Sequence, residues 1–164
     1  MTEELFSRDR YELPGGALRR LTAADAAALG ASLTAMDPWR ALGYEAAGLA
    51  AYLQRPDPAL ARFVAVVDGA VAGAIAVRFP WLRGPQLELF AVLDAFQRRG
   101  LAAAMMTWLE NESFRGAPNL WTCVSSFNDR ARRFYKSRGF AEVATIPDLV
   151  RAGFDEILLR KQRP

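Results

Sequence analysis

The sequence contains no histidine and a single cysteine, Cys123. The lack of histidine excludes Ser-His-Asp triads and histidine-bound metal sites, and one cysteine cannot form a zinc cluster or an intramolecular disulfide. A chain without disulfides fits a reducing compartment, so we expect a cytoplasmic protein that binds no metal. We also expect no transmembrane span, because no run of about 18 apolar residues occurs, and no secretory signal, because the N-terminus lacks an apolar leader.

The composition is that of a globular protein, with 52% hydrophobic and 24% charged residues among 164, which suffices for a hydrophobic core. No repeat, linker or low-complexity segment interrupts the sequence, so we predict a single domain over residues 1–164, with residues 1–14 as an N-terminal arm. The net charge of +3 favours an anionic partner only mildly. A nucleic-acid-binding domain would need a broader basic surface with interleaved aromatic residues, which makes it the weakest function considered.

Hydrophobic periodicity and turn residues predict a mixed α/β fold. The expected strands cover residues 17–21, 62–67, 70–79, 86–93, 120–125, 140–145 and 154–161, and the expected helices cover residues 22–37, 39–54, 98–114 and 128–138. Thr22 and Asp25 have capping-box spacing, and Asp68-Gly69 predicts a hairpin turn. Because strands 86–93 and 120–125 flank one helix, we expect them to be parallel neighbours. The result is a mixed sheet with helices on both faces.

The segment Leu87–Ala104 leads from an apolar strand through Gln97-Arg98-Arg99-Gly100-Leu101-Ala102 into a helix. Such a loop points several backbone N–H groups toward one spot at the positive end of the helix dipole, which suits a phosphate or pyrophosphate. Gly100 allows close approach of the backbone, and the arginines add donors. Taken alone, the segment is equally compatible with a solvated helix start. The nucleotide-hydrolase phosphate loop and the dinucleotide fingerprint are both absent.

A second segment, Ser126–Phe140 (SFNDRARRFYKSRGF), completes a pair of motifs that resembles the GNAT superfamily of acyl-CoA-dependent N-acyltransferases. The phosphate loop of that family, Gln/Arg-x-x-Gly-x-Gly/Ala, is matched by Gln97, Gly100 and Ala102. Its second signature is matched by Asn128, Ala131, Phe134, Tyr135, Gly139 and Phe140. The resemblance covers about residues 17–161. It implies a mostly antiparallel sheet of six to seven strands with one splayed parallel pair.

The resemblance also implies acetyl-CoA as cosubstrate. The pantetheine arm is expected to add to strand 86–93 through the backbone of Phe90, Ala91 and Val92. The pyrophosphate is expected on the loop residues Gln97, Arg98, Arg99, Gly100, Leu101, Ala102 and Ala103. The far side of the arm is expected to be lined by Asn128, Ala131, Phe134 and Tyr135. Arg98, Arg99 and Arg133 are the candidates for the adenosine 3′-phosphate.

Tyr135 is the predicted general acid for the departing thiolate, because the pKa of a phenol, about 10, is close to that of an alkyl thiol, about 8.5. The backbone N–H of Val92 is expected to polarise the carbonyl group. Glu88 is the candidate base, on a strand face that alternation shares with Gln86, Phe90 and Val92. The usual family position for this carboxylate falls on Gln86, so a structural carboxylate at Glu88 and a water relay remain alternatives.

We therefore predict an N-acetyltransferase that moves an acetyl group from acetyl-CoA directly to a primary amine. Residues 22–55 and the loop 146–153 are expected to frame the acceptor, with Trp39, Tyr44, Trp121 and Asp148 as lining or core residues. Cys123 is expected to be a small buried residue, since no histidine or lysine activates it. The alternative is a catalytically silent acyl-CoA-binding regulatory module. The acceptor and a possible homodimer are left open.

Overall fold

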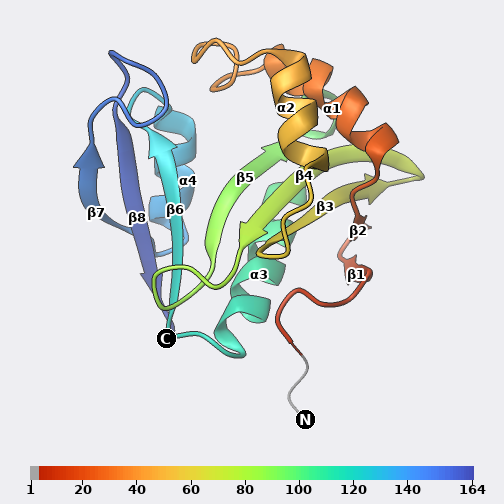
Figure 1. Ribbon diagram of the computed structural model, residues 1–164. Coiled ribbons are helices and arrows are strands. Elements are labelled where there is room, and N and C mark those ends of the chain that lie inside the picture. Colours follow the sequence, from red (N-terminus) through yellow and green to blue (C-terminus); the bar gives the residue numbers. More distant parts are fainter. Residues whose placement is uncertain (1–3) are drawn as a thin grey trace.

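The computed structural model describes residues 4–164, which form one open eight-stranded sheet in the order β1-β2-β3-β4-β5-β6-β8-β7 (Figure 1). The strands are β1 (Arg10–Leu13), β2 (Gly16–Arg20), β3 (Leu60–Val67), β4 (Ala70–Arg78), β5 (Gln86–Val92), β6 (Asn119–Ser125), β7 (Ala141–Ile146) and β8 (Glu156–Gln162). The helices are α1 (Ala23–Thr34), α2 (Ala46–Gln54), α3 (Leu101–Phe114) and α4 (Asp129–Ser137), with a short 3-10 turn η1 (Asp94–Phe96). Among these residues, no helix has the length and apolar character needed to cross a bilayer.

The predicted mixed α/β architecture is confirmed, including the parallel pairing of β5 with β6. The other neighbouring strands pair antiparallel. The sheet has eight strands rather than six to seven, because the N-terminal arm supplies β1, which pairs with β2 from Arg10 to Leu13. Asp68 and Gly69 form the predicted hairpin turn, with φ of 50° and 78°, as a two-residue turn of this kind requires.

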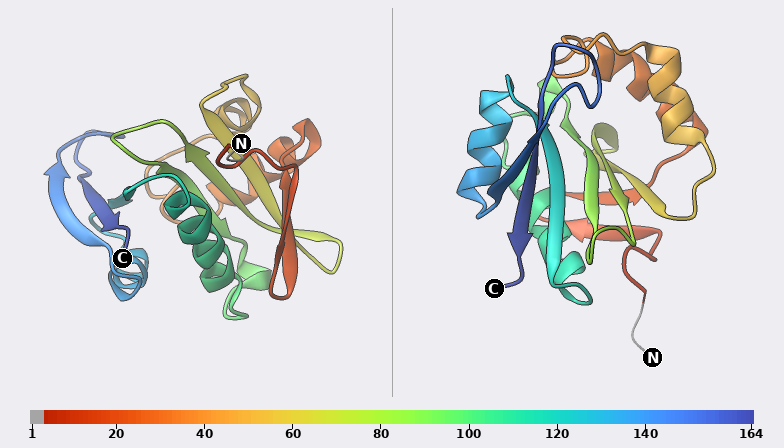
Figure 2. Two further views of the ribbon diagram at one scale, coloured as in Figure 1. Left: turned by 90° about the horizontal axis from the view of Figure 1, so that it is seen from below. Right: turned by 60° about the vertical axis from the view of Figure 1, so that its left-hand side comes forward.

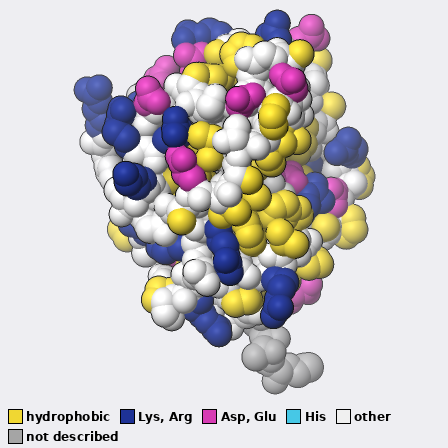
Figure 3. Space-filling view, turned by 90° about the vertical axis from the view of Figure 1, so that its left-hand side faces the viewer, with side chains coloured by type: hydrophobic (Ala, Val, Ile, Leu, Met, Phe, Trp, Pro, Cys, Tyr) yellow, Lys and Arg dark blue, Asp and Glu magenta, His cyan; other side chains and the backbone are white. Residues whose placement is uncertain are grey.

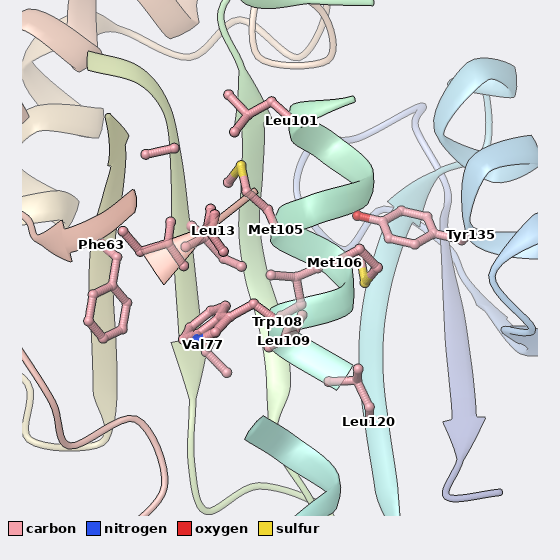
Figure 4. Packing of buried hydrophobic residues seen from close by; sticks show 14 of the residues in the cluster. Leu13, Phe63, Val77, Leu101, Met105, Met106, Trp108, Leu109, Leu120 and Tyr135 are labelled. Carbon is pink, nitrogen blue, oxygen red and sulfur yellow. The ribbon is translucent and has the colours of Figure 1, made fainter. Parts of the chain in front are cut away.

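Helices cover both faces of the sheet (Figures 1 and 2). α1 and α2 pack on one face, where Leu29, Leu49 and Leu89 share a buried cluster. α3 and α4 pack on the other face, where Met105, Leu109 and Tyr135 belong to a larger cluster (Figure 4). The sheet is therefore a middle layer that separates two apolar cores.

α1 begins as predicted: Thr22 and Asp25 form a reciprocal capping box, and Arg19 pairs with the same carboxylate at 2.6 Å. The second helix is shorter than predicted, because it begins at Ala46 and not at Trp39. Residues 36–44 (the 36–44 turns) instead form a bend followed by successive turns, and Gly43 has a left-handed φ of 72° that an α-helix does not accommodate. These turns place a loop, rather than a helix, over the sheet.

The parallel strands β5 and β6 pair only at Gln86–Trp121 and Leu87–Thr122 and then diverge. A β-bulge accompanies the divergence, since Ala76 and Val77 of β4 oppose Leu89 and Leu87 and leave Glu88 as the extra residue. A bulge bends its strand and interrupts the alternation of side chains. The pair therefore opens directly after Leu87.

The bulge corrects one expectation from the sequence. Alternation placed Glu88 on the same face as Phe90 and Val92, but those two residues pack with the α3–α4 cluster. Glu88 instead accepts a hydrogen bond from Tyr52 of α2. The carboxylate therefore lies on the face that α1 and α2 cover.

The β7 edge of the sheet is open. Residues 141–145 of β7 are exposed on both of its faces, and the side chain of Val143 is 52% accessible. Figure 3 shows hydrophobic side chains gathered in a band down this side of the molecule, with basic side chains beside it. The cavity described below lies on the inner side of the neighbouring strands β6 and β8.

Candidate active site

A cavity of about 920 Å³ is lined by both divergent strands and by segments from both faces of the sheet. β5 contributes residues 86–92, and β6 contributes residues 122–125. The start of α3 and one side of α4 line it on one face, and the 36–44 turns, α2 and the β7–β8 loop line it on the other. Because β5 and β6 are unpaired here, the cavity connects the two faces of the sheet.

One end of the cavity is the N-terminus of α3. Ala104 is the first residue whose N–H reaches back within the helix, to the carbonyl of Gly100 at 3.0 Å. The N–H groups of Leu101, Ala102 and Ala103 therefore have no intrahelical acceptor, and no side chain caps this helix. Unpaired N–H groups at the positive end of a helix form an anion site.

The loop before α3 has a backbone shaped to hold an anion. Arg98 and Gly100 both take left-handed φ values, 62° and 80°, a conformation that turns successive N–H groups toward one point. A side chain at Gly100 would meet no neighbouring atom, so the residue is required there for its φ and not for space. Arg98 lines the cavity, whereas Arg99 lies outside the lining, with its guanidinium 5.6 Å from the ring of Phe96.

A short hydrogen-bond chain fixes this loop to both β5 and α4. The Gln97 side-chain amide donates to the carbonyl of Val92 at 3.0 Å, and Arg130 donates to Gln97 Oε1 at 2.8 Å. Arg130 also lines the cavity, whereas Arg133 on the same helix does not. Sequence reasoning named Arg133 and missed Arg130, because nothing local distinguishes two arginines on one exposed helix.

The open edge of β5 faces the cavity. Leu93 N–H donates to Ala72 of the β4 hairpin, and main-chain groups alternate along a strand, so the N–H of Val92 points to the opposite side, toward β6. The same alternation turns the main-chain groups of Phe90 toward the cavity and those of Ala91 toward β4. Phe90 and Phe134 stack at a centroid separation of 6.0 Å beside this edge.

Tyr135 reaches from α4 into the cavity wall, and Figure 4 shows its hydroxyl pointing toward α3. Burial raises the pKa of Tyr135 to about 12, and a hydrogen bond with Thr122 opposes that rise. The phenol is therefore protonated at neutral pH and can donate a proton. Asn128 caps α4 by accepting a hydrogen bond from Ala131 N–H at 3.2 Å. This cap fixes the start of the helix that carries Tyr135.

Glu88 lies in the cavity wall with both carboxylate oxygens engaged. Tyr52 donates to Oε2 at 2.8 Å, and the Arg78 guanidinium binds Oε1. Arg78 also pairs with Asp57 at 3.0 Å. Burial and the Glu88 charge raise the pKa of Tyr52 well above its usual range. Accepting a proton would require Glu88 to give up its ion pair, which suits a structural carboxylate better than a base.

The end of the cavity opposite α3 is framed by two loops, as expected from the sequence. The 36–44 turns contribute Trp39 and Tyr44, and the β7–β8 loop contributes Leu149 and Val150. The two loops touch, because Arg151 lies against Gly43, and Figure 2 shows them side by side above the sheet. This end is therefore mainly aromatic and aliphatic.

Glu156 is a lining residue that sequence reasoning missed. It opens β8, pairs across the sheet with Ser125 of β6, and is only 5% exposed. Ser125 Oγ donates to Glu156 Oε1 at 2.6 Å. Burial raises the pKa of Glu156, although the serine hydrogen bond opposes the rise. Within residues 4–164, Glu156 forms no ion pair, in contrast to Glu88.

Two other predicted positions, Trp121 and Asp148, fall outside the cavity lining. Trp121 lies under Trp81 at the paired end of β5 and β6, and its Nε1 donates to the Leu82 carbonyl at 2.8 Å, so it is a structural residue. Asp148 accepts from Gly153 N–H and holds the β7–β8 loop. Cys123 does line the cavity, but burial, and secondarily the charge of Glu156, raise its pKa to about 11, which disfavours a thiolate nucleophile.

Comparisons with known proteins agree with this geometry. Residues 29–140 match the acetyltransferase (GNAT) family. The chain belongs to this family of acyltransferases. It is 32% identical over 108 residues to an uncharacterized N-acetyltransferase of Methanocaldococcus jannaschii, and the match covers 62% of this chain and 66% of that protein. The chain thus spans slightly less than two thirds of the length of that relative.

Solved structures with limited sequence identity to this chain share its fold. Ard1 from Thermoplasma volcanium has a TM-score of 0.73 at 22% identity, covering 92% of this chain and 99% of that one. The ribosomal-protein-S18-alanine N-acetyltransferase from Escherichia coli has a TM-score of 0.71 at 22% identity, covering 90% and 93%. At these identities the likeness establishes the architecture alone. Among residues 4–164, no group of three or more acidic or cysteine side chains is arranged to hold a metal ion.

Proposed function

We propose that this GNAT protein, as a single domain over residues 1–164, transfers an acetyl group from acetyl-CoA directly to a primary amine. The observation that carries the proposal is the cavity through the opened β5–β6 pair, because it joins an anion site on one face to a largely apolar recess with three acidic residues on the other. Direct transfer needs such a passage, since donor and acceptor must meet while approaching from different sides.

The residues at the α3 end fit a coenzyme A diphosphate. The unpaired N–H groups of Leu101, Ala102 and Ala103 supply donors at a helix N-terminus. Arg98 and Arg130 are the two basic side chains in the cavity lining, and guanidinium groups bind phosphate oxygens well. The unpaired edge of β5 at Phe90 and Val92 suits an amide-containing arm that adds alongside a strand.

The chemistry requires few protein groups. We expect the N–H of Val92, which points away from β4, to donate to the thioester carbonyl and to stabilise the negative charge that develops on its oxygen. Tyr135, protonated at neutral pH, donates its proton to the departing sulfur. The walls of the cavity hold the amine beside the carbonyl carbon. Glu88 as the base stays an untested prediction, and its ion pair argues against it.

Thiol release tests the proposal. The protein is mixed with acetyl-CoA and a panel of primary amines that includes tyramine, hexylamine and short peptides, and the free thiol is followed with time. We expect amine-dependent release, and we expect Tyr135→Phe to lower kcat by about 100-fold without changing the affinity for CoA. Tyr11→Phe is the matched control, because Tyr11 is a buried tyrosine that does not line the cavity.

The alternative function, a catalytically silent acyl-CoA-binding regulatory module, predicts CoA binding by calorimetry with no amine ever acetylated. Amine-dependent release by the wild-type protein that Tyr135→Phe leaves unchanged would contradict the role assigned to Tyr135. A cytoplasmic location remains a prediction of the sequence, which leaves the oligomeric state open.

A further inference from the structure

The charged residues that line the cavity are separated by sign. The basic ones, Arg98 and Arg130, lie at the α3–α4 end. The acidic ones, Asp37, Glu88 and Glu156, lie toward α1, α2 and the β7–β8 loop. A cavity with this charge distribution attracts cations to its acidic end and the diphosphate of coenzyme A to its basic end. The acceptor side is therefore suited to a positively charged group.

The three acidic residues are not equivalent. Asp37 pairs with Arg40 at 3.0 Å and is half exposed, and Glu88 pairs with Arg78. Glu156 is buried, bonded to the neutral Ser125, and has no ion pair within the described chain. A buried carboxylate without a cationic partner is costly. Glu156 and Ile157 are consecutive in β8, so their side chains point to opposite faces of the sheet. Ile157 packs on the α4 side, so the side chain of Glu156 faces the acceptor side.

We propose, on the basis of the proposed function above, that Glu156 binds the ammonium group of the acceptor and removes its proton, and that the acceptor is a primary amine carried on an apolar group. The apolar group is accommodated by Trp39, Tyr44, Leu149 and Val150, which surround the recess. An ammonium group supplies the cationic partner that Glu156 lacks. The same contact places the nitrogen on the cavity side of β6 and β8.

The proposed step balances as follows in atoms and protons. Glu156 takes one proton from R–NH3⁺, and the freed lone pair forms the C–N bond to the thioester carbonyl carbon. As the C–S bond breaks, the sulfur takes the proton of Tyr135 and the nitrogen loses its second proton to water. Water restores the proton of Tyr135, and Glu156 returns its proton to solvent, so one proton is released overall.

The groups that surround Glu156 determine its titration. Ser125 and Cys123 face it from β6, Tyr44 faces it from the 36–44 turns, and β7 pairs with it through Ile146. None of these groups is cationic. Burial therefore dominates and raises the pKa of Glu156, which makes its carboxylate a stronger base than an exposed glutamate.

The test compares Glu156→Gln, Glu88→Gln and the control Glu142→Gln, an exposed residue of β7 outside the cavity. Thiol release is measured from pH 6 to 10 with tyramine, hexylamine and a Met-Leu peptide, and CoA affinity is measured by calorimetry. We expect Glu156→Gln to lower kcat/KM by about 100-fold and to move the acid limb of the pH profile to higher pH. Glu88→Gln loses less than about tenfold, and Glu142→Gln loses nothing. CoA affinity stays unchanged in all three, which also shows that each variant is folded.

Ser125→Ala is a second variant that keeps the carboxylate and removes its hydrogen bond. Relative to the wild-type protein, we expect a moderate loss of kcat and a shift of the acid limb of the pH profile to higher pH. The reason is that the hydrogen bond from Ser125 lowers the pKa of Glu156. If Glu156→Gln turns over amines at the wild-type rate, or if Glu88→Gln loses more activity than Glu156→Gln, the role assigned to Glu156 is wrong while the proposed function stands. No turnover of any amine by the wild-type protein overturns the proposed function, and this inference with it.

Discussion

The two ends of the cavity are built in different ways. At the α3 end, one continuous segment from Leu93 to Ala103 supplies the anion site, mostly through main-chain N–H groups. At the acceptor end, side chains come from the 36–44 turns, α2, β6 and β8, which are far apart in the sequence. A site made of backbone at a helix start tolerates varied side chains but needs particular φ values. A site made of side chains depends on their identity, so the two ends respond differently to substitution.

The largest expected effect is at Gly100. Its φ of 80° is unfavourable for a β-branched residue, so Gly100→Val changes the loop that presents the N–H groups. We expect the Kd for CoA to rise by about 100-fold in calorimetry. Gly15→Val is the matched control, because Gly15 has a φ of 79°, open space around it and a position in the β1–β2 turn. Equal loss of affinity in both variants would mean that general destabilisation, and not the anion site, is responsible.

The next comparison separates two arginines of α4. Arg130 lines the cavity and bonds to Gln97 at 2.8 Å, whereas Arg133 is exposed outside it. We expect Arg130→Gln to weaken CoA binding by about tenfold and to reduce its dependence on salt. Arg133→Gln is expected to bind CoA as the wild-type protein does. The reverse order would place the phosphate-binding arginine on the outer side of α4.

At the acceptor end, Tyr44 offers a ring to the recess and is 39% exposed. Removing an aromatic wall in Tyr44→Ala is expected to raise the KM for the amine by about fivefold while CoA affinity stays unchanged. Leu82→Ala is the control, because Leu82 is 55% exposed and outside the cavity. A change in CoA affinity instead of amine KM would assign Tyr44 to the cofactor side.

The contrast between the two ends also explains how much the sequence could predict. The anion loop and the Asn128 cap are local features, so residue spacing predicted the helices α3 and α4, and the resemblance of the second motif to the GNAT signature singled out Tyr135. Glu156 could not be found in this way, because only the strand order β6-β8-β7 brings it beside Ser125. The face of Glu88 was predicted wrongly, because the bulge adds one residue to β5 without a glycine or proline to mark it. Trp121 shows the same limit, since its position beside Trp81 depends on where β5 and β6 pair.

The smallest expected effect concerns stability. Burial raises the pKa of Glu156 in the folded protein above its unfolded value of 4.5, so the folded state binds the proton more tightly, and stability decreases as pH rises through this interval. Glu156→Gln removes the charge and keeps an acceptor for Ser125. We expect equal melting temperatures at pH 4 and a variant about 2–4 °C more stable at pH 8. A carboxylate retained for binding a cation destabilises the folded protein, so its neutralisation is stabilising. The opposite holds for a purely structural carboxylate such as Asp25, whose neutralisation removes a stabilising ion pair with Arg19. A less stable Glu156→Gln at pH 8 would therefore place Glu156 in the structural class, and calorimetric melting at the two pH values decides between them.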